Sequence, residues 1–309
     1  MKTPLRFFVL GLLVFLVVLG FFFEHNLNPY YLQILIYIGI NLTLAMSLNL
    51  INGFTGQFSL GHAGFMSIGA YSMAFLTTKV VPPSLLTHPV FFVVLLMSGL
   101  ISAFAGFLIG VPSLRLRGDY LAIVTLGFGE IIRVSIQNID ALGGPRGFTS
   151  IPHLTHFFDV FAVAILCIAV VFFLVKSTYG KGFLAVRDDE LAAQAMGIST
   201  TRYKVTAFVI SSFFAGVSGA LYAGYITYIT PGQFGFMRSI EIVVMVIVGG
   251  MGSIPGVIMS SIVLTVLPEL LRAVSQFRMI LYALSLILLM LLRPQGLFSG
   301  IKFRKRGVQ

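Results

Sequence analysis

The sequence predicts an all-α, polytopic membrane protein with about ten transmembrane helices. Hydrophobic residues make up 58% of its 309 residues and charged residues only 10%, and the mean hydropathy is +1.00. A water-soluble domain of this length could not cover its surface with so few charges. The apolar residues also fall into runs of membrane-spanning length, separated by polar loops.

The predicted spans follow one another along the whole chain. They lie at about residues 7–23, 30–50, 58–78, 90–111, 120–137, 157–175, 205–226, 239–250, 255–274 and 279–293. The first follows the basic residues Lys2 and Arg6, as in a signal peptide, but it is long and ends without a small-residue cleavage site. We therefore expect it to be a retained span, and residues 1–309 to form one transmembrane domain.

Basic residues set the predicted orientation. With both termini in the cytoplasm, about fourteen Lys and Arg residues fall on the cytoplasmic side and about five on the outer side. The reverse orientation would oppose the positive-inside rule. The net charge of +10 is therefore explained by membrane orientation, and no nucleic acid partner is expected.

The longest polar passage, residues 176–204, contains a candidate docking surface. Three of the ten acidic residues, Asp188, Asp189 and Glu190, are adjacent there. The Leu- and Ala-rich segment behind them predicts a short helix that stops at Gly197. The acids lie at the start of this helix, where its dipole favours negative charge. A short charged helix beneath a bundle of spans indicates a surface on which a cytoplasmic partner docks.

The second and third predicted spans are unusually polar and rich in glycine. Polar groups in hydrocarbon are costly unless they pair or face a cavity, and broken helices survive there only when protein or water surrounds them. Two readings follow: hydrogen bonding and close packing between helices, or the lining of a translocation pathway with a discontinuous entry into the third span. The candidate pathway residues are Asn41, Asn49, Gln57, Ser59, Gly61, His62, Gly64 and Ser67.

Few ionisable residues lie within the spans, and they are spaced to pair. Glu130 with Arg133, and Arg238 with Glu241, are three residues apart on a helix. The sequence has no G-x-x-x-x-G-K-[ST] phosphate loop and no series of ionisable groups like that of proton-driven carriers. The histidines and the single Cys167 show no metal-binding spacing, and no catalytic grouping is apparent. We therefore expect no bound metal or cofactor, no enzymatic activity, and a driving force supplied by another polypeptide.

Four passages together resemble the LivM-like membrane permeases of branched-chain amino acid ABC importers, and the resemblance covers essentially the full length. They are residues 48–50 running into 53–71, LRLRGDYLAIVTLGFGE at 114–130, RDDELAAQAMGISTTRYK at 187–204, and residues 249–256. The resemblance implies an ABC importer permease bundle in the bacterial inner membrane, surrounded by lipid. It also implies a homologous second permease, two cytoplasmic ATP-binding subunits that use ATP and Mg, and an extracytoplasmic substrate-binding protein that provides most of the amino acid recognition.

The resemblance further implies that the 176–204 loop is the element that couples to the ATPase. The candidate coupling residues are Arg187, Asp188, Asp189, Glu190, Ala192, Ala193 and Gly197. The general coupling motif of importers reads Glu-Ala-Ala, three residues and Gly. Here Leu191 occupies the first position and the acid is displaced to Glu190, so the acid that contacts the ATPase stays open.

Two alternative functions remain at the level of sequence. Permeases of urea and short-chain amide importers are very similar, so a urea or amide substrate is the alternative within the same class. A self-sufficient secondary transporter or channel is the alternative from another class, and it predicts transport without an ATPase.

Overall fold

The computed structural model describes residues 28–114, 116 and 118–274, together with the isolated positions 280, 283, 284 and 287. The predicted first span, most of the predicted last span and the basic tail lie outside these residues. The described part is helical, and its extended pairing is limited to one isolated β-bridge between Phe148 and Ile229. The predicted all-α class is therefore confirmed for this part of the chain.

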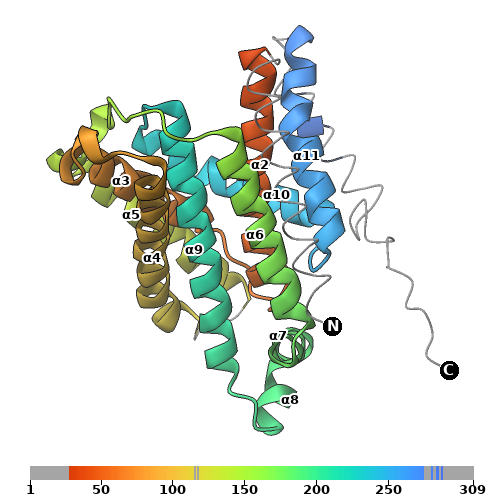
Figure 1. Cartoon of the computed structure of the whole chain (residues 1–309). Helices are drawn as coiled ribbons and strands as arrows, with labels where there is room; N and C mark the ends of the chain where they lie inside the picture. The colour runs from red at the N-terminus through yellow and green to blue at the C-terminus, as the bar shows by residue number, and fades with distance from the viewer. Residues whose placement is uncertain are drawn as a thin grey trace, which may run out of the picture.

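Ten α-helices carry the described fold (Figure 1). They are α2 (Pro29–Asn49), α3 (His62–Phe75), α4 (His88–Ser113), α5 (Asp119–Gln137), α6 (Phe157–Lys176), α7 (Thr178–Asp188), α8 (Glu190–Ala195), α9 (Thr200–Ile226), α10 (Phe236–Gly249) and α11 (Ile254–Leu270). Five described helical stretches are long and apolar enough to cross a membrane: Pro29–Phe54, His88–Ser113, Phe157–Lys176, Thr200–Ile226 and Pro231–Gly249. Each of them overlaps a predicted span.

Local sequence signals explain where several helices begin. The Asn28 side chain accepts a hydrogen bond from the Tyr30 amide at the start of α2, and Pro29 follows at a position that needs no amide donor. Ser253 caps α11 in the same way through the Gly256 amide. These caps satisfy amides that a helix cannot pair internally, which matters most where water is scarce.

The third predicted span begins differently from the sequence expectation. A π-helical turn, η1 (Leu50–Phe54), extends α2, and residues 55–61 then run without helical structure before α3 starts at His62. The predicted discontinuity is therefore present, but the helix starts four residues later than the predicted residue 58. Most of this non-helical segment is buried, as expected for irregular backbone at membrane depth.

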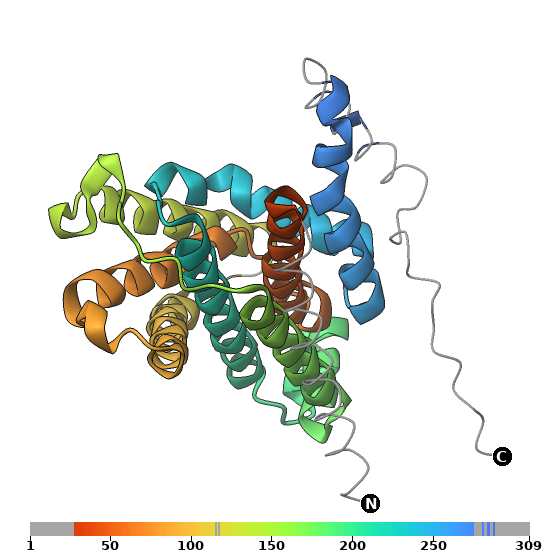
Figure 2. The ribbon, with the colours of Figure 1, turned by 45° about the horizontal axis from the view of Figure 1, so that its top comes forward.

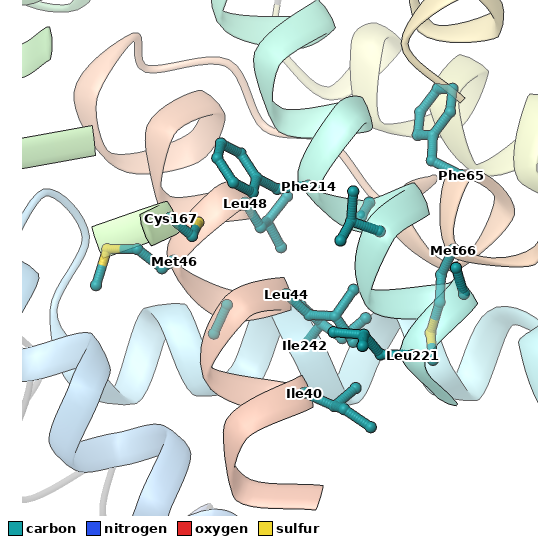
Figure 3. Packing of buried hydrophobic residues seen from close by; sticks show 14 of the residues in the cluster. Ile40, Leu44, Met46, Leu48, Phe65, Met66, Cys167, Phe214, Leu221 and Ile242 are labelled. Carbon is teal, nitrogen blue, oxygen red and sulfur yellow. The ribbon is translucent and has the colours of Figure 1, made fainter. Parts of the chain in front are cut away.

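Helix α9 lies at the centre of the bundle, where backbones approach closely. It packs against α3 and α4 on one side and α2 on another. A Cβ atom added at Gly69 of α3 would clash with the Gly216 carbonyl of α9, and one added at Gly219 would clash with the Met66 carbonyl. Figure 3 shows Leu44, Leu221 and Ile242 pointing toward one another where α2, α9 and α10 meet. Small residues at a helix crossing allow the close packing on which membrane bundles depend.

The two ends of the bundle are built differently. Helices α7 and α8 project at the end where α9 begins (Figure 1), and the 3-10 turn η6 (Pro231–Phe234) follows the opposite end of α9. Because α9 has 27 residues, these ends are about 40 Å apart. The sequence analysis predicted α8 but not α7, whose N-cap, Ser177, accepts a hydrogen bond from the Gly180 amide.

The close crossing of α3 and α9 can be tested with two identical substitutions. Gly69→Ala should destabilise the protein by about 1–3 kcal/mol, because the new methyl group meets the Gly216 carbonyl. Gly127→Ala in α5 is the matched control: no heavy atom lies within 4 Å of its new Cβ, so it should be neutral or slightly stabilising. Thermal unfolding in detergent measures both, and equal melting temperatures would contradict the crossing.

Candidate functional site

Helix α8 is short but has well-formed caps at both ends. The Asp189 carboxylate accepts hydrogen bonds from the Leu191 and Ala192 amides, at 2.9 and 3.0 Å. At the other end Gly197 has φ +82°, a left-handed conformation that favours glycine. There the Ile198 amide bonds to the Ala193 carbonyl and the Gly197 amide to the Gln194 carbonyl. The predicted short helix and its glycine stop are confirmed.

The three adjacent acids have different surroundings. Glu190 pairs with Lys204 of α9 at 2.7 Å, and the Lys204 side chain is only 6% exposed. Asp189 is the cap of α8, and Asp188 is exposed and paired with its neighbour Arg187. This partly buried pair therefore joins α8 to the long central helix, a contact that sequence spacing could not reveal.

Two large apolar side chains protrude from α8 and its C-cap. Leu191 is 63% exposed and Met196 is 83% exposed, whereas Ala193 between them is buried. Large apolar side chains that protrude from a capped, fixed helix are typical of a protein contact. Ala192 is also exposed, and its small side chain adds little to this apolar surface.

Arg187 connects this end of the structure to the break in the second span. Its Nη1 donates to the Gly53 carbonyl at 3.4 Å, and Gly56 is packed against its side chain. Gly56 has φ +69°, so a side chain there would be strained as well as crowded. Asn49 reinforces the junction, because its Oδ1 accepts from the Gly252 amide at 2.8 Å.

Side chains satisfy much of the backbone of the non-helical segment 55–61. The Ser59 amide donates to Asn52 Oδ1 at 3.2 Å, and the Leu60 amide donates to Thr125 Oγ1 at 3.0 Å. The segment also carries polar side-chain atoms with no partner among the described residues. They are Gln57 Oε1 and Nε2 and Ser59 Oγ, and the neighbouring Asn49 Nδ2 and Asn52 Nδ2 share this property.

Some candidate pathway residues hold helices together. His62 Nε2 lies 2.9 Å from Ser47 Oγ, and Ser67 donates to the Gly64 carbonyl. Gly61 is packed against the Thr125 carbonyl, and a Cβ at Gly64 would lie 2.9 Å from Gly129 Cα. The structure thus gives His62, Gly61 and Gly64 contacts between α3 and its neighbours. The Ser67 hydrogen bond lies within α3, and the pathway role of all four residues stays a prediction.

Two other candidates line cavities. Gln57 borders a small cavity of about 60 Å³ together with Glu190 and Lys204. Asn41 borders a cavity of about 490 Å³ between α2, η6, α10 and α11. This larger cavity lies toward the η6 end, opposite the end that carries α8.

Asn41 is at the centre of a hydrogen-bond chain in the larger cavity. It donates through Nδ2 to Thr265 Oγ1 at 2.9 Å and accepts through Oδ1 from Arg238 Nη2 at 2.6 Å. Arg238 Nη1 also pairs with Glu241 at 2.9 Å. The predicted pairs Arg238–Glu241 and Glu130–Arg133 are both confirmed. Sequence spacing does not predict the contact of Arg238 with Asn41, because the two residues are far apart along the chain.

The described residues hold no group of three His, Cys, Asp or Glu side chains that could bind a metal ion. The fold and the two sites define the class of protein: a multi-pass helical membrane protein with buried polar groups between its helices and a short, capped helix that protrudes at one end. Comparison with known sequences identifies the family of the chain. The family described as branched-chain amino acid transport system / permease component matches residues 30–292, and the chain belongs to this family.

Several curated proteins are similar over much of the chain. The permease protein LivM of a high-affinity branched-chain amino acid transport system from Salmonella typhimurium is 36% identical over 330 aligned positions, which cover 94% of this chain and 74% of the relative. LivM of Escherichia coli is 38% identical, over 84% of this chain and 67% of the relative. The permease LivH of Escherichia coli is 30% identical over 45% of each chain. No solved structure gives a significant match.

The ion pair beneath α8 can be tested against an exposed pair in the same loop. Glu190→Gln should destabilise the protein by about 3–5 kcal/mol, because it leaves the buried Lys204 ammonium without its carboxylate. Asp188→Asn should cost about 0–1 kcal/mol, because the Arg187–Asp188 pair is exposed. Thermal unfolding of the purified permease compares them. Adding Lys204→Met to Glu190→Gln should recover most of the loss, and equal effects of the two single substitutions would contradict the structural role of the pair.

Proposed function

We propose that this chain is a permease subunit of an ATP-driven importer of branched-chain amino acids in the bacterial inner membrane. The LivM relatives are named as permeases of branched-chain amino acid transport systems, which supports the substrate, and the similarity to LivH supports a homologous second permease as partner. Two cytoplasmic ATP-binding subunits would supply the driving force, and an extracytoplasmic binding protein would deliver the substrate. In this proposal the chain binds no cofactor and catalyses no reaction, because ATP and Mg are used by the partner subunits.

The observation that carries the proposal is the construction of α8. A permease that is moved by an ATPase needs a contacting element that protrudes from the helix bundle and is rigidly connected to it. Helix α8 is capped at both ends and joined to α9 by the partly buried Glu190–Lys204 pair. Arg187 joins the same end to the break after α2. Movement of α8 would therefore be transmitted directly to α9 and to the non-helical segment 55–61.

The contacts made by the residues of α8 indicate which of its side chains would contact the ATPase. Glu190 is engaged with Lys204 and Asp189 with the α8 amides, so neither acid is free to turn outward. Leu191 and Met196 are the most exposed large apolar side chains of α8 and its C-cap. We infer that they enter a cleft on the ATPase, with Asp188 at the rim.

The same proposal extends to parts of the chain that the structure leaves open. The whole of residues 1–309 would form one permease domain of about ten spans, with both termini and the α8 end in the cytoplasm. The polar side chains of residues 49–59 would contribute to the translocation pathway, which two homologous permeases would share. A zwitterionic amino acid needs polar groups of this kind on its route across the membrane.

Uptake in proteoliposomes tests the function. The chain, its second permease, the ATP-binding subunits and the binding protein are reconstituted together and supplied with radiolabelled leucine. We expect ATP-dependent leucine uptake that excess valine inhibits and excess urea does not. Uptake of urea instead would keep the architecture and overturn the substrate. Uptake without ATP would contradict the importer mechanism and favour a secondary transporter or channel.

The docking face is tested by truncating its two apolar side chains. In the assembled importer, Leu191→Ala with Met196→Ala should lower leucine uptake and substrate-stimulated ATP hydrolysis by about tenfold or more, because buried apolar anchors carry much of an interface energy. Met251→Ala is the matched control: Met251 is also exposed, at 54%, and lies in the loop that meets Asn49 and Arg187. If all variants insert normally and transport leucine equally, α8 does not dock through these side chains.

A further inference from the structure

The cavity of about 490 Å³ at the η6 end combines opposite charges with apolar walls. Helices α2, α10 and α11 lie side by side around it in both Figures 1 and 2. Its volume falls within the range of about 300–1,000 Å³ that is typical of small-molecule sites. Tyr222, Met245 and Leu264 supply apolar wall, and Arg238 and Glu241 supply one charge of each sign.

We propose that this cavity is the site where the permease holds the zwitterionic head group of its amino-acid cargo, with Arg238 facing the carboxylate and Glu241 facing the ammonium group. The inference rests on the proposed transport function and adds to it the place and the residues of contact. It does not depend on how α8 meets the ATPase.

The guanidinium of Arg238 is fixed in position rather than loosely placed. Asn41 Oδ1 accepts from its Nη2, and the Asn41 amide group is oriented in turn by Thr265. Thr265 Oγ1 donates to the Ser261 carbonyl at 2.6 Å, so the chain of hydrogen bonds runs from α11 through α2 to α10. A charged residue near a membrane-spanning helix is costly and usually marks a pathway or a ligand. A planar guanidinium held by neighbours is suited to binding a carboxylate.

Glu241 remains accessible while it pairs with Arg238. Its side chain is 48% exposed, whereas that of Arg238 is 20% exposed. The carboxylate and ammonium groups of an amino acid are attached to one carbon atom, so they are close enough to meet an adjacent Arg and Glu at the same time. Each charge of the cargo then finds an opposite charge, and the site stays neutral overall. Such a contact favours entry without trapping the cargo.

The same arrangement discriminates between substrates. Urea is uncharged, so in its hydrogen bonds to Arg238 and Glu241 only the protein partner would carry a charge, and it could form no ion pair with either residue. An aliphatic side chain would contact Met245 and Leu264, which urea would leave uncovered. The position of the cavity is also suitable, because it lies at the end of the bundle opposite α8, where an extracytoplasmic protein would release its ligand.

Cysteine protection in the reconstituted importer tests the site directly. Met237 borders the cavity and is 73% exposed, and the native Cys167 is buried. In a Met237→Cys variant, alkylation of this chain by a soluble maleimide should slow by about threefold or more at saturating leucine. Leucinol, which lacks the carboxylate, and 4-methylpentanoate, which lacks the ammonium group, should protect much less. Adding Arg238→Gln or Glu241→Gln should abolish protection by leucine.

Uptake provides the second measurement and separates this inference from the proposed function. Arg238→Gln and Glu241→Gln should each reduce ATP-dependent leucine uptake by about tenfold. Arg133→Gln is the matched control, because Glu130–Arg133 has the same spacing and lies outside the cavity; it should keep uptake within about twofold of the wild type. If leucine uptake is normal in the wild type and in both cavity variants, or if leucine gives no protection, the site is wrong and the transport function stands. If the wild-type importer takes up no leucine, the proposed transport function itself is contradicted.

Discussion

The structure depends on one constraint: a non-helical stretch of chain lies buried beside membrane-spanning helices, and its polar backbone must be satisfied by protein. Residues 55–61 meet this requirement with side chains from two directions. Asn52 and Thr125 accept from amides of the stretch, and Gly61 allows α5 to approach it closely. The stretch therefore forms a junction between α5 and the end of the helix that precedes it.

The junction lies between the two candidate sites. On one side Arg187 and the Glu190–Lys204 pair connect it to α8. On the other side α2 leads from Asn49 to Asn41, which lines the larger cavity and holds Arg238. A displacement of α8 would reach the cavity through α2 and α9, both of which pack on the same core. This would provide a physical route from the proposed ATPase contact to the proposed substrate contact within one chain.

Local signals predicted some parts of the molecule well, and long-range contacts explain the rest. Apolar runs predicted the spans that the structure describes, and the Leu- and Ala-rich segment with Gly197 predicted α8, because helix propensity and helix stops act over a few residues. Spacing also predicted the Arg238–Glu241 pair. The pairing of Glu190 with Lys204 and of Asn41 with Arg238 could not be predicted, because it depends on how distant helices cross. For the same reason the contact between His62 and Ser47 could not be predicted from the sequence.

The most direct test of the coupling account is the structure of the assembled importer, determined by electron cryomicroscopy with its ATP-binding subunits. The account predicts that α8 is seated in a cleft of an ATP-binding subunit, with Leu191 and Met196 buried there and the Glu190–Lys204 pair intact. It also predicts that α8, α9 and residues 55–61 move together between nucleotide states. An α8 that remains exposed to solvent, or that moves while α9 and the junction stay in place, would contradict the account.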